Sequence, residues 1–117
     1  MIRPDPKAAE VLAARALHAE RQAMRPFRRA FREAMSRTPA PGDLSKTFPH
    51  MLAAFDAAVA EERRADPYAP LVKWHDDVTQ MVRLHPDMGA FAERFGVSDE
   101  ALDDLFRLAL RIEAGEA

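Results

Sequence analysis

Five arginines near the N-terminus have a spacing that suits the binding of anions. Four of them recur every three or four residues, so on a helix they project as one strip with the fifth beside it: Arg21, Arg25, Arg28 and Arg32, with Arg29 adjacent. The guanidinium group is a planar fork that matches the oxygens of phosphates and carboxylates. The strip is therefore a candidate surface for nucleic acid or for an acidic protein, and a solvated flank of the helix is the alternative.

Apolar side chains share this predicted helix with the arginines. They recur at steps of three, four and seven residues, which predicts one stripe along the helix: Ala13, Leu17, Met24, Phe27, Phe31, Ala34 and Met35. Methionine and phenylalanine at helical spacing occur far more often in a hydrophobic core than in a cofactor site. We expect the larger members to be part core and part partner interface, with the arginine strip orienting the partner: Leu17, Met24, Phe27 and Phe31.

A cluster of acidic residues opens the last predicted helix: Asp99, Glu100, Asp103 and Asp104. Negative charge at a helix N-terminus is favoured by the helix dipole, by about 0.3–1 kcal/mol per residue. Asp103 is also expected to pair with Arg107 one turn later. These effects account for the acidic patch without a bound ion.

The histidines do not have the neighbours that a metal site on one helix requires. Two ligands must lie three or four residues apart, and no histidine or carboxylate occupies those offsets from any of the four: His18, His50, His75 and His85. We therefore expect no metal. The pair His75-Asp76 is of the kind that phosphohydrolases use, and a small metal-dependent hydrolase with a site at His75, Asp76 and Asp77 is the third candidate function.

Other catalytic arrangements cannot be identified in the sequence. The chain has no cysteine, which excludes thiolate catalysis, disulfides and cysteine-bound metal clusters. It has only four glycines, none of them in a phosphate-binding loop, and no Ser-His-Asp constellation can be singled out. We therefore expect a protein that is not an enzyme and that needs no cofactor.

The elements that position these residues are all predicted to be helices. A length of 117 residues with 48% hydrophobic residues suits one domain spanning 1–117, and good helix formers dominate while β-branched residues are scarce. No apolar run approaches the roughly 18 residues of a membrane span. The absence of cysteine fits a reducing cytoplasm. We expect a cytoplasmic, compact all-α bundle of five or six helices.

Prolines and capping residues mark the expected ends of the first two helices. The first helix opens at Asp5-Pro6, with the aspartate as N-cap and the proline at the first helical position. Pro26 predicts either a kink or a split into two helices, because a proline inside a straight helix costs about 3 kcal/mol. The segment 38–43 is the clearest loop, and a second helix is expected from about residue 47 to residue 65.

Three helices are predicted in the second half of the chain. The first of them opens at Pro70 and carries the stripe Leu71, Trp74, Val78, Met81 and Val82. A short helix with Met88, Phe91 and Phe95 ends at Gly96. Ser98 is a good N-cap for the final helix, whose inner side carries Leu102, Leu105, Phe106, Ala109 and Ile112.

The segment 91–98 resembles the first helix and turn of a helix-turn-helix DNA-binding protein. The sequence pattern typical of that turn is an alanine four residues before a glycine, followed by valine and a capping serine: Ala92, Gly96, Val97 and Ser98. The resemblance implies that the following helix enters the major groove. That helix begins with the acidic patch and has no positive charge before Arg107, so DNA would repel it. We interpret the segment as a packed helical corner.

The charge of the chain is unevenly distributed. Residues 1–46 contain ten Lys and Arg against five Asp and Glu, whereas residues 47–117 contain seven against fourteen. Such an asymmetry points to partners. We expect a binding or adaptor protein that packs helices against a partner protein or a second copy of itself. The alternative is a nucleic-acid-handling accessory protein that uses the arginine strip, similar in outline to phage-type small terminase subunits.

Overall fold

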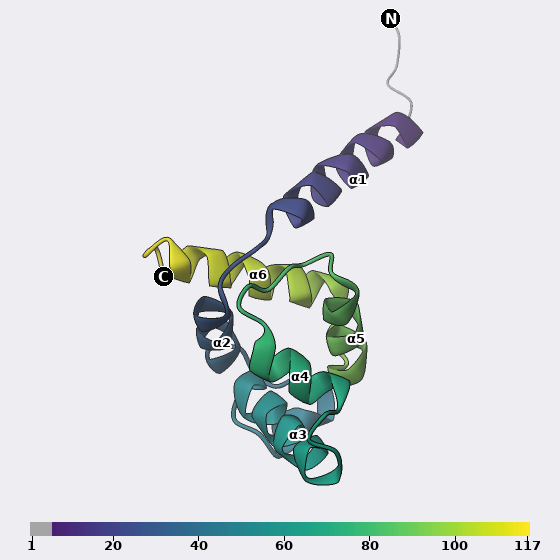
Figure 1. Ribbon diagram of the computed structural model, residues 1–117. Coiled ribbons are helices and arrows are strands. Elements are labelled where there is room, and N and C mark those ends of the chain that lie inside the picture. Colours follow the sequence, from purple (N-terminus) through teal and green to yellow (C-terminus); the bar gives the residue numbers. More distant parts are fainter. Residues whose placement is uncertain (1–5) are drawn as a thin grey trace, which may run out of the picture.

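The computed structural model describes residues 6–117, and the regular elements in this range are helices (Figure 1). The expected all-α fold is confirmed. The only pairing of strand type in the described range is an isolated antiparallel bridge between Phe27 and Gln80. The elements are α1 (Pro6–Ala23), α2 (Arg28–Ser36), the 3-10 helix η1 (Gly42–Lys46), α3 (Met51–Ala65), α4 (Pro70–Asp77), α5 (Pro86–Phe95) and α6 (Asp99–Glu113).

The predicted first helix is split in two at Pro26. The chain is extended between α1 and α2, and Phe27, which precedes α2, has a ψ of 154°. Pro26 has no N–H to give to a helix, but its carbonyl accepts a hydrogen bond of 2.8 Å from the N–H of Met81. Of the two alternatives, the split is therefore confirmed. The expected N-cap Asp5 lies outside the described residues.

The helix that opens at Pro70 is shorter than its apolar stripe predicted. It ends at Asp77, and the stripe residues Val78, Met81 and Val82 lie in an extended segment. This segment runs antiparallel to the linker between α1 and α2, through hydrogen bonds of 2.8–3.1 Å that include Arg28 N–H to Thr79 O. The prediction of a helix through residue 82 is wrong, because backbone pairing with a distant segment replaces the helical hydrogen bonds.

Local capping signals place most of the other helix ends. Gly96 adopts the left-handed conformation after α5, with φ 68°, and Ser98 accepts the N–H of Ala101 at 3.1 Å to cap α6. The helix expected from about residue 47 begins at Met51 instead. His50 is its N-cap, since its Nδ1 accepts the N–H of Ala53 at 3.1 Å.

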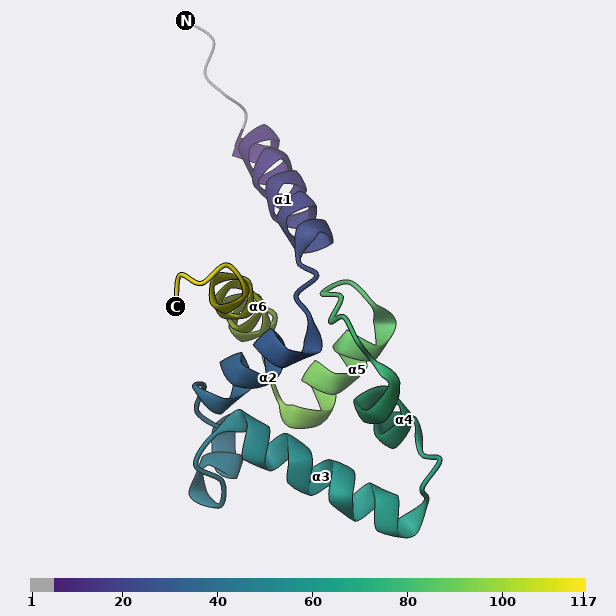
Figure 2. The same cartoon turned by 60° about the vertical axis from the view of Figure 1, so that its left-hand side comes forward.

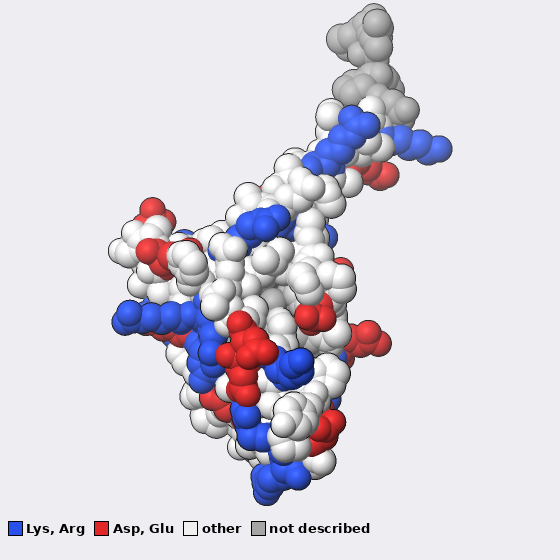
Figure 3. All heavy atoms as spheres, in the orientation of Figure 1, with Lys and Arg blue, Asp and Glu red and all other residues white. Residues whose placement is uncertain are grey.

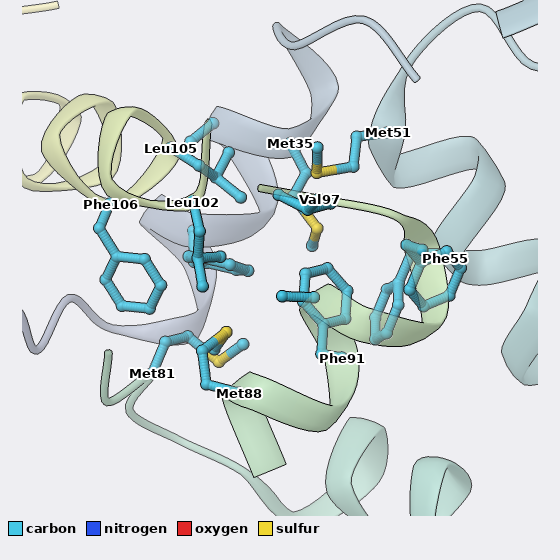
Figure 4. Close-up of a cluster of buried hydrophobic side chains, with 14 of the residues drawn as sticks. Met35, Met51, Phe55, Met81, Met88, Phe91, Val97, Leu102, Leu105 and Phe106 are labelled. Carbon is cyan, nitrogen blue, oxygen red and sulfur yellow. The ribbon is translucent and has the colours of Figure 1, made fainter. Parts of the chain in front are cut away.

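The hydrophobic core lies where α2, α3, α5 and α6 meet (Figure 4). Phe31 of α2 is fully buried, and its ring centroid lies 5.0 Å from that of Phe106 and 6.3 Å from that of Phe91. Phe55 packs edge-on against Phe91 at 5.4 Å and against Trp74 at 5.9 Å. These contacts join α2 to α6 and connect α3 to α4 and α5, so one continuous core holds five of the six α-helices.

The remaining helix, α1, projects away from this core as an arm (Figures 1 and 2). None of its residues is buried, and the described chain measures 65 × 29 × 28 Å because the arm extends it along one axis. The expectation of a compact bundle therefore holds for the part that contains α2–α6. No helix within residues 6–117 is both long and apolar enough to cross a membrane.

Candidate interaction surfaces

The predicted arginine strip is not one continuous surface. Arg21 lies in the last turn of α1, Arg25 lies in the extended linker, and the other three belong to α2: Arg28, Arg29 and Arg32. An extended linker does not preserve the 100° rotation per residue on which the strip was predicted. The single helix on which the strip was predicted is therefore absent, and the two groups must be considered separately.

Arg21 anchors the base of the arm on α6 through a buried ion pair. Its Nε and Nη2 donate to the carboxylate of Asp103 at 3.0 and 2.8 Å, and Arg83 Nε donates to the same carboxylate at 2.9 Å. The side chain of Asp103 is only 4% exposed and that of Arg83 only 6% exposed. Burial alone would raise the pKa of Asp103, but the hydrogen bonds from Arg21 and Arg83 outweigh it and lower the pKa. Arg21 is thus held within the chain.

A second contact ties the arm to α6 at the surface. Arg107 donates to Glu20 at 2.7 Å through Nε and at 3.2 Å through Nη2, and these hydrogen bonds lower the pKa of Glu20. Arg107 also donates to Asp104 at 3.1 Å. The expected ion pair of Asp103 with Arg107 is therefore replaced by pairs that reach across to α1.

The four members of the acidic patch consequently have different environments. Asp103 is buried between two arginines, Asp99 accepts from Arg83 at 3.3 Å, and Asp104 is paired with Arg107. Glu100 is exposed. Arg21 from the basic first part of the chain thus meets Asp103 from the acidic last part, and in Figure 3 the two signs of charge intermingle on the body. Part of the charge asymmetry in the sequence is satisfied inside the molecule.

The arginines of α2 line an open hollow of about 620 Å³, which we call the arginine hollow. Its lining consists of Phe27, Arg28, Arg29, Arg32, His75, Asp76, Val78 and Thr79. Arg32 forms a two-pronged ion pair with Asp56 of α3, at 3.0 and 3.1 Å. Within the described part of the chain, the side chains of Arg28 and Arg29 form neither an ion pair nor a hydrogen bond. The hollow therefore contains two uncompensated guanidinium groups.

The residues of the hydrolase hypothesis are divided between two places. His75 and Asp76 line the arginine hollow, where His75 Nδ1 and Asp76 Oδ1 are 2.8 Å apart. Hydrogen bonds from Arg63 at 2.7 and 2.8 Å lower the pKa of Asp76. Asp77 lines a different hollow, beside Trp74. No group of three or more potential metal-ligating side chains comes together within residues 6–117.

The four apolar residues predicted as part core and part interface have separate positions. Met24 and Phe31 are fully buried and lie in the core, so neither reaches the surface. Leu17 is half-buried on α1. Phe27 is 60% exposed, and its backbone N–H donates to Glu113 at 3.2 Å. Phe27 is therefore the member of this set that is most accessible to a partner.

The arm carries an apolar face that the sequence analysis missed. Five exposed residues follow one another at steps of three, four, three and four, and we call them the arm seam: Ala9, Leu12, Ala16, Ala19 and Ala23. This is the spacing of the a and d positions of a coiled coil. The spacing is present in the sequence, but the stripe predicted through Ala13 and Leu17 contains larger side chains and lies on another face of the helix.

Comparisons with known proteins give no relative for this chain. No protein-family model, no curated protein and no solved structure matches it. Function must therefore be argued from the two surfaces described above, the arm seam and the arginine hollow.

Proposed function

We propose that this protein is a non-enzymatic binding protein that docks through α1, and that its partner is a second copy of the chain. The observation that carries the proposal is that an 18-residue helix buries none of its residues. In proteins most helical stability comes from the packing of an apolar face against other elements, not from the helix propensity of the residues alone. The arm therefore has a surface that residues 6–117 of a single chain do not cover.

The arm seam is suited to another helix. Its one large residue, Leu12, is 63% exposed, and the four alanines around it would let a second backbone approach closely. The hydrogen bonds that tie the arm to α6 come from Glu20 and Arg21, in its last turns. Residues nearer the N-terminus, including Ala9 and Leu12, are left accessible.

Charges beside the seam support a second copy in parallel orientation. Arg15 flanks one edge of the seam and Glu20 the other, at the five-residue offset that pairs across a parallel two-stranded coiled coil. An antiparallel pair would instead place Arg15 near the Arg15 of the other copy. Glu20 already accepts from Arg107, but a carboxylate has about four lone-pair sites and can accept a second donor.

The test is the solution mass of the full chain as a function of concentration. We expect the mass to rise from the 13.1 kDa of one chain towards twice that value, and Ala16→Glu to shift this rise to higher concentration, because it places a charge in the seam. Ala14→Glu is the matched control, since it lies on the opposite side of α1. The two substitutions should destabilise the helix itself to a similar extent, because each places a glutamate four residues from an existing one, Glu20 for Ala16→Glu and Glu10 for Ala14→Glu. A wild-type chain that stays monomeric at all concentrations would refute self-association.

The orientation can be tested separately because the chain has no cysteine. In a parallel pair Ala9→Cys faces itself, so mild oxidation should give a covalent dimer. In an antiparallel pair Ala9→Cys alone should not cross-link, whereas a mixture with Ala19→Cys should. The second result would overturn the parallel arrangement and leave self-association standing.

A further inference from the structure

The arginine hollow has positive charge that the described residues do not neutralise. Arg28 and Arg32 are four residues apart on one face of α2, a spacing at which like charges repel. Asp56 compensates Arg32, and Arg63 with His75 occupies the carboxylate of Asp76. The acidic side chains at the hollow are thus already paired, while Arg28 and Arg29 are not. An anion bound in the hollow would supply the counter-charge that Arg28 and Arg29 lack among the described residues.

The rim of the hollow adds an aromatic surface to this charge. Phe27 lines the hollow and is 60% exposed, although most of the phenylalanines of the chain are buried. A flat ring beside guanidinium groups is the arrangement with which proteins hold nucleotides, because bases stack on the ring and phosphates bind the arginines. A carboxylate-bearing peptide would use the arginines but would make no use of the ring as a stacking surface.

From this juxtaposition we infer that the arginine hollow binds nucleotide units, with the phosphate at Arg28 and Arg29 and the base stacked on Phe27. The hollow is open to solvent, so a nucleotide bound in it can belong to a longer strand, as in proteins that bind single strands without sequence preference. This inference is independent of the arm: it uses α2 and α4, and the arm seam lies on α1. It replaces the predicted strip of five arginines by a smaller group that shares one site.

The experiment measures binding of fluorescently labelled oligothymidylate to the full-length protein across a salt series. Each phosphate contact on a single strand contributes about 0.7 to the slope of log affinity against log salt. The double variant Arg28→Gln/Arg29→Gln should bind more weakly at low salt and have a slope smaller by about 1.4, at about 0.7 for each lost contact. Arg37→Gln is the control for charge: it lies at the other end of the same helix, where it is exposed and paired with Glu33.

Phe27→Leu tests the stacking contact. It keeps an apolar side chain at an exposed position but removes the ring, so affinity for oligothymidylate should fall about tenfold, within the range measured for loss of one stacked base. Affinity for an abasic strand of the same length should not change. A thermal melt of each variant confirms that the fold is retained.

Competing ligands identify the source of the nucleotide. If a free mononucleotide competes as well as the oligonucleotide at equal molar concentration, the hollow binds small nucleotides. If the mononucleotide competes much more weakly, the hollow binds a strand. Competition by polyglutamate as effective as that by the oligonucleotide would overturn the inference in favour of a general anion surface. Absence of saturable binding at low salt, or equal effects of the hollow variants and Arg37→Gln, would also overturn it.

Discussion

The consecutive helices α1 and α2 are separated by four residues, and only one of them is part of the core. α2 concentrates its apolar side chains on one face, and all of them are buried: Ala30, Phe31, Ala34 and Met35. In α1 the large apolar residues Val11, Leu12 and Leu17 point in three directions, about 100–140° apart at 100° per residue. The large apolar residues of α1 therefore do not converge on one face, and its continuous apolar face, the arm seam, contains only one of them, Leu12.

The two helices also differ in whether their arginines are paired, and here α2 is the helix that lacks internal partners. Arg21 at the end of α1 is committed to a buried carboxylate, whereas Arg28 and Arg29 at the start of α2 have no acidic partner in the described chain. The arm is thus held by ion pairs, and none of its apolar side chains is buried. In contrast, α2 is held by apolar packing, and two of its arginines stay unpaired among the described residues.

The largest expected effect comes from substituting a buried residue of α2, and the same substitution experiment on an exposed residue of α1 tests whether the two helices contribute differently to the free energy of unfolding. Phe31→Ala should lower the free energy of unfolding by about 3–5 kcal/mol, because it empties the space between Phe91 and Phe106. Leu12→Ala on the arm should change it by less than about 0.5 kcal/mol in dilute protein. Urea denaturation of both variants measures the contrast. A loss of more than 1 kcal/mol, roughly, for Leu12→Ala would mean that the arm packs on the body.

The second effect concerns the anchor of the arm. Asp103→Asn removes the charge that two arginines share and leaves Arg83 buried without a full counter-charge, so unfolding should become easier by about 3 kcal/mol. Asp104→Asn is the matched control, since Asp104 is exposed and only its surface pair with Arg107 is lost. Urea denaturation at neutral pH gives both values. Equal effects of the two substitutions would show that the buried pair does not stabilise the fold.

The pH dependence of the same pair gives a smaller effect of defined sign. Because the pKa of Asp103 is lowered in the folded chain, its contribution is complete above the unfolded pKa of about 3.9 and is lost as the pH falls through the folded value. The stability difference between wild type and Asp103→Asn should therefore narrow below about pH 4. Urea denaturation at neutral and acidic pH measures it, and a difference that stays constant into strong acid would contradict the lowered pKa.

The sequence predicts those features that depend on neighbouring residues. Gly96 and Ser98 end and begin helices through their own backbone and side chain, and Pro70 opens α4 as its position predicted. What the sequence does not predict is set by residues far along the chain. The segment after Asp77 is extended because it pairs with the linker at Pro26, and Arg21 is an anchor because Asp103 lies 82 positions away. The arginine hollow also requires two helices and could not be found from spacing on one.

The smallest free energies of local opening are expected in the arm itself, and measuring them compares α1 with α2 most directly. In dilute protein the backbone amides in the first turns of α1 should exchange with protection worth about 0–1 kcal/mol, because the ion pairs that tie the arm to α6 lie in its last turns, while those of α2 should approach the protection of global unfolding. Hydrogen exchange followed by mass spectrometry measures both helices in one experiment. Raising the protein concentration should increase the protection of α1 alone if a second copy covers the arm seam, and Ala16→Glu should abolish that increase while Ala14→Glu should not. Strong protection of α1 that does not depend on concentration would instead mean that the arm is stabilised within one chain.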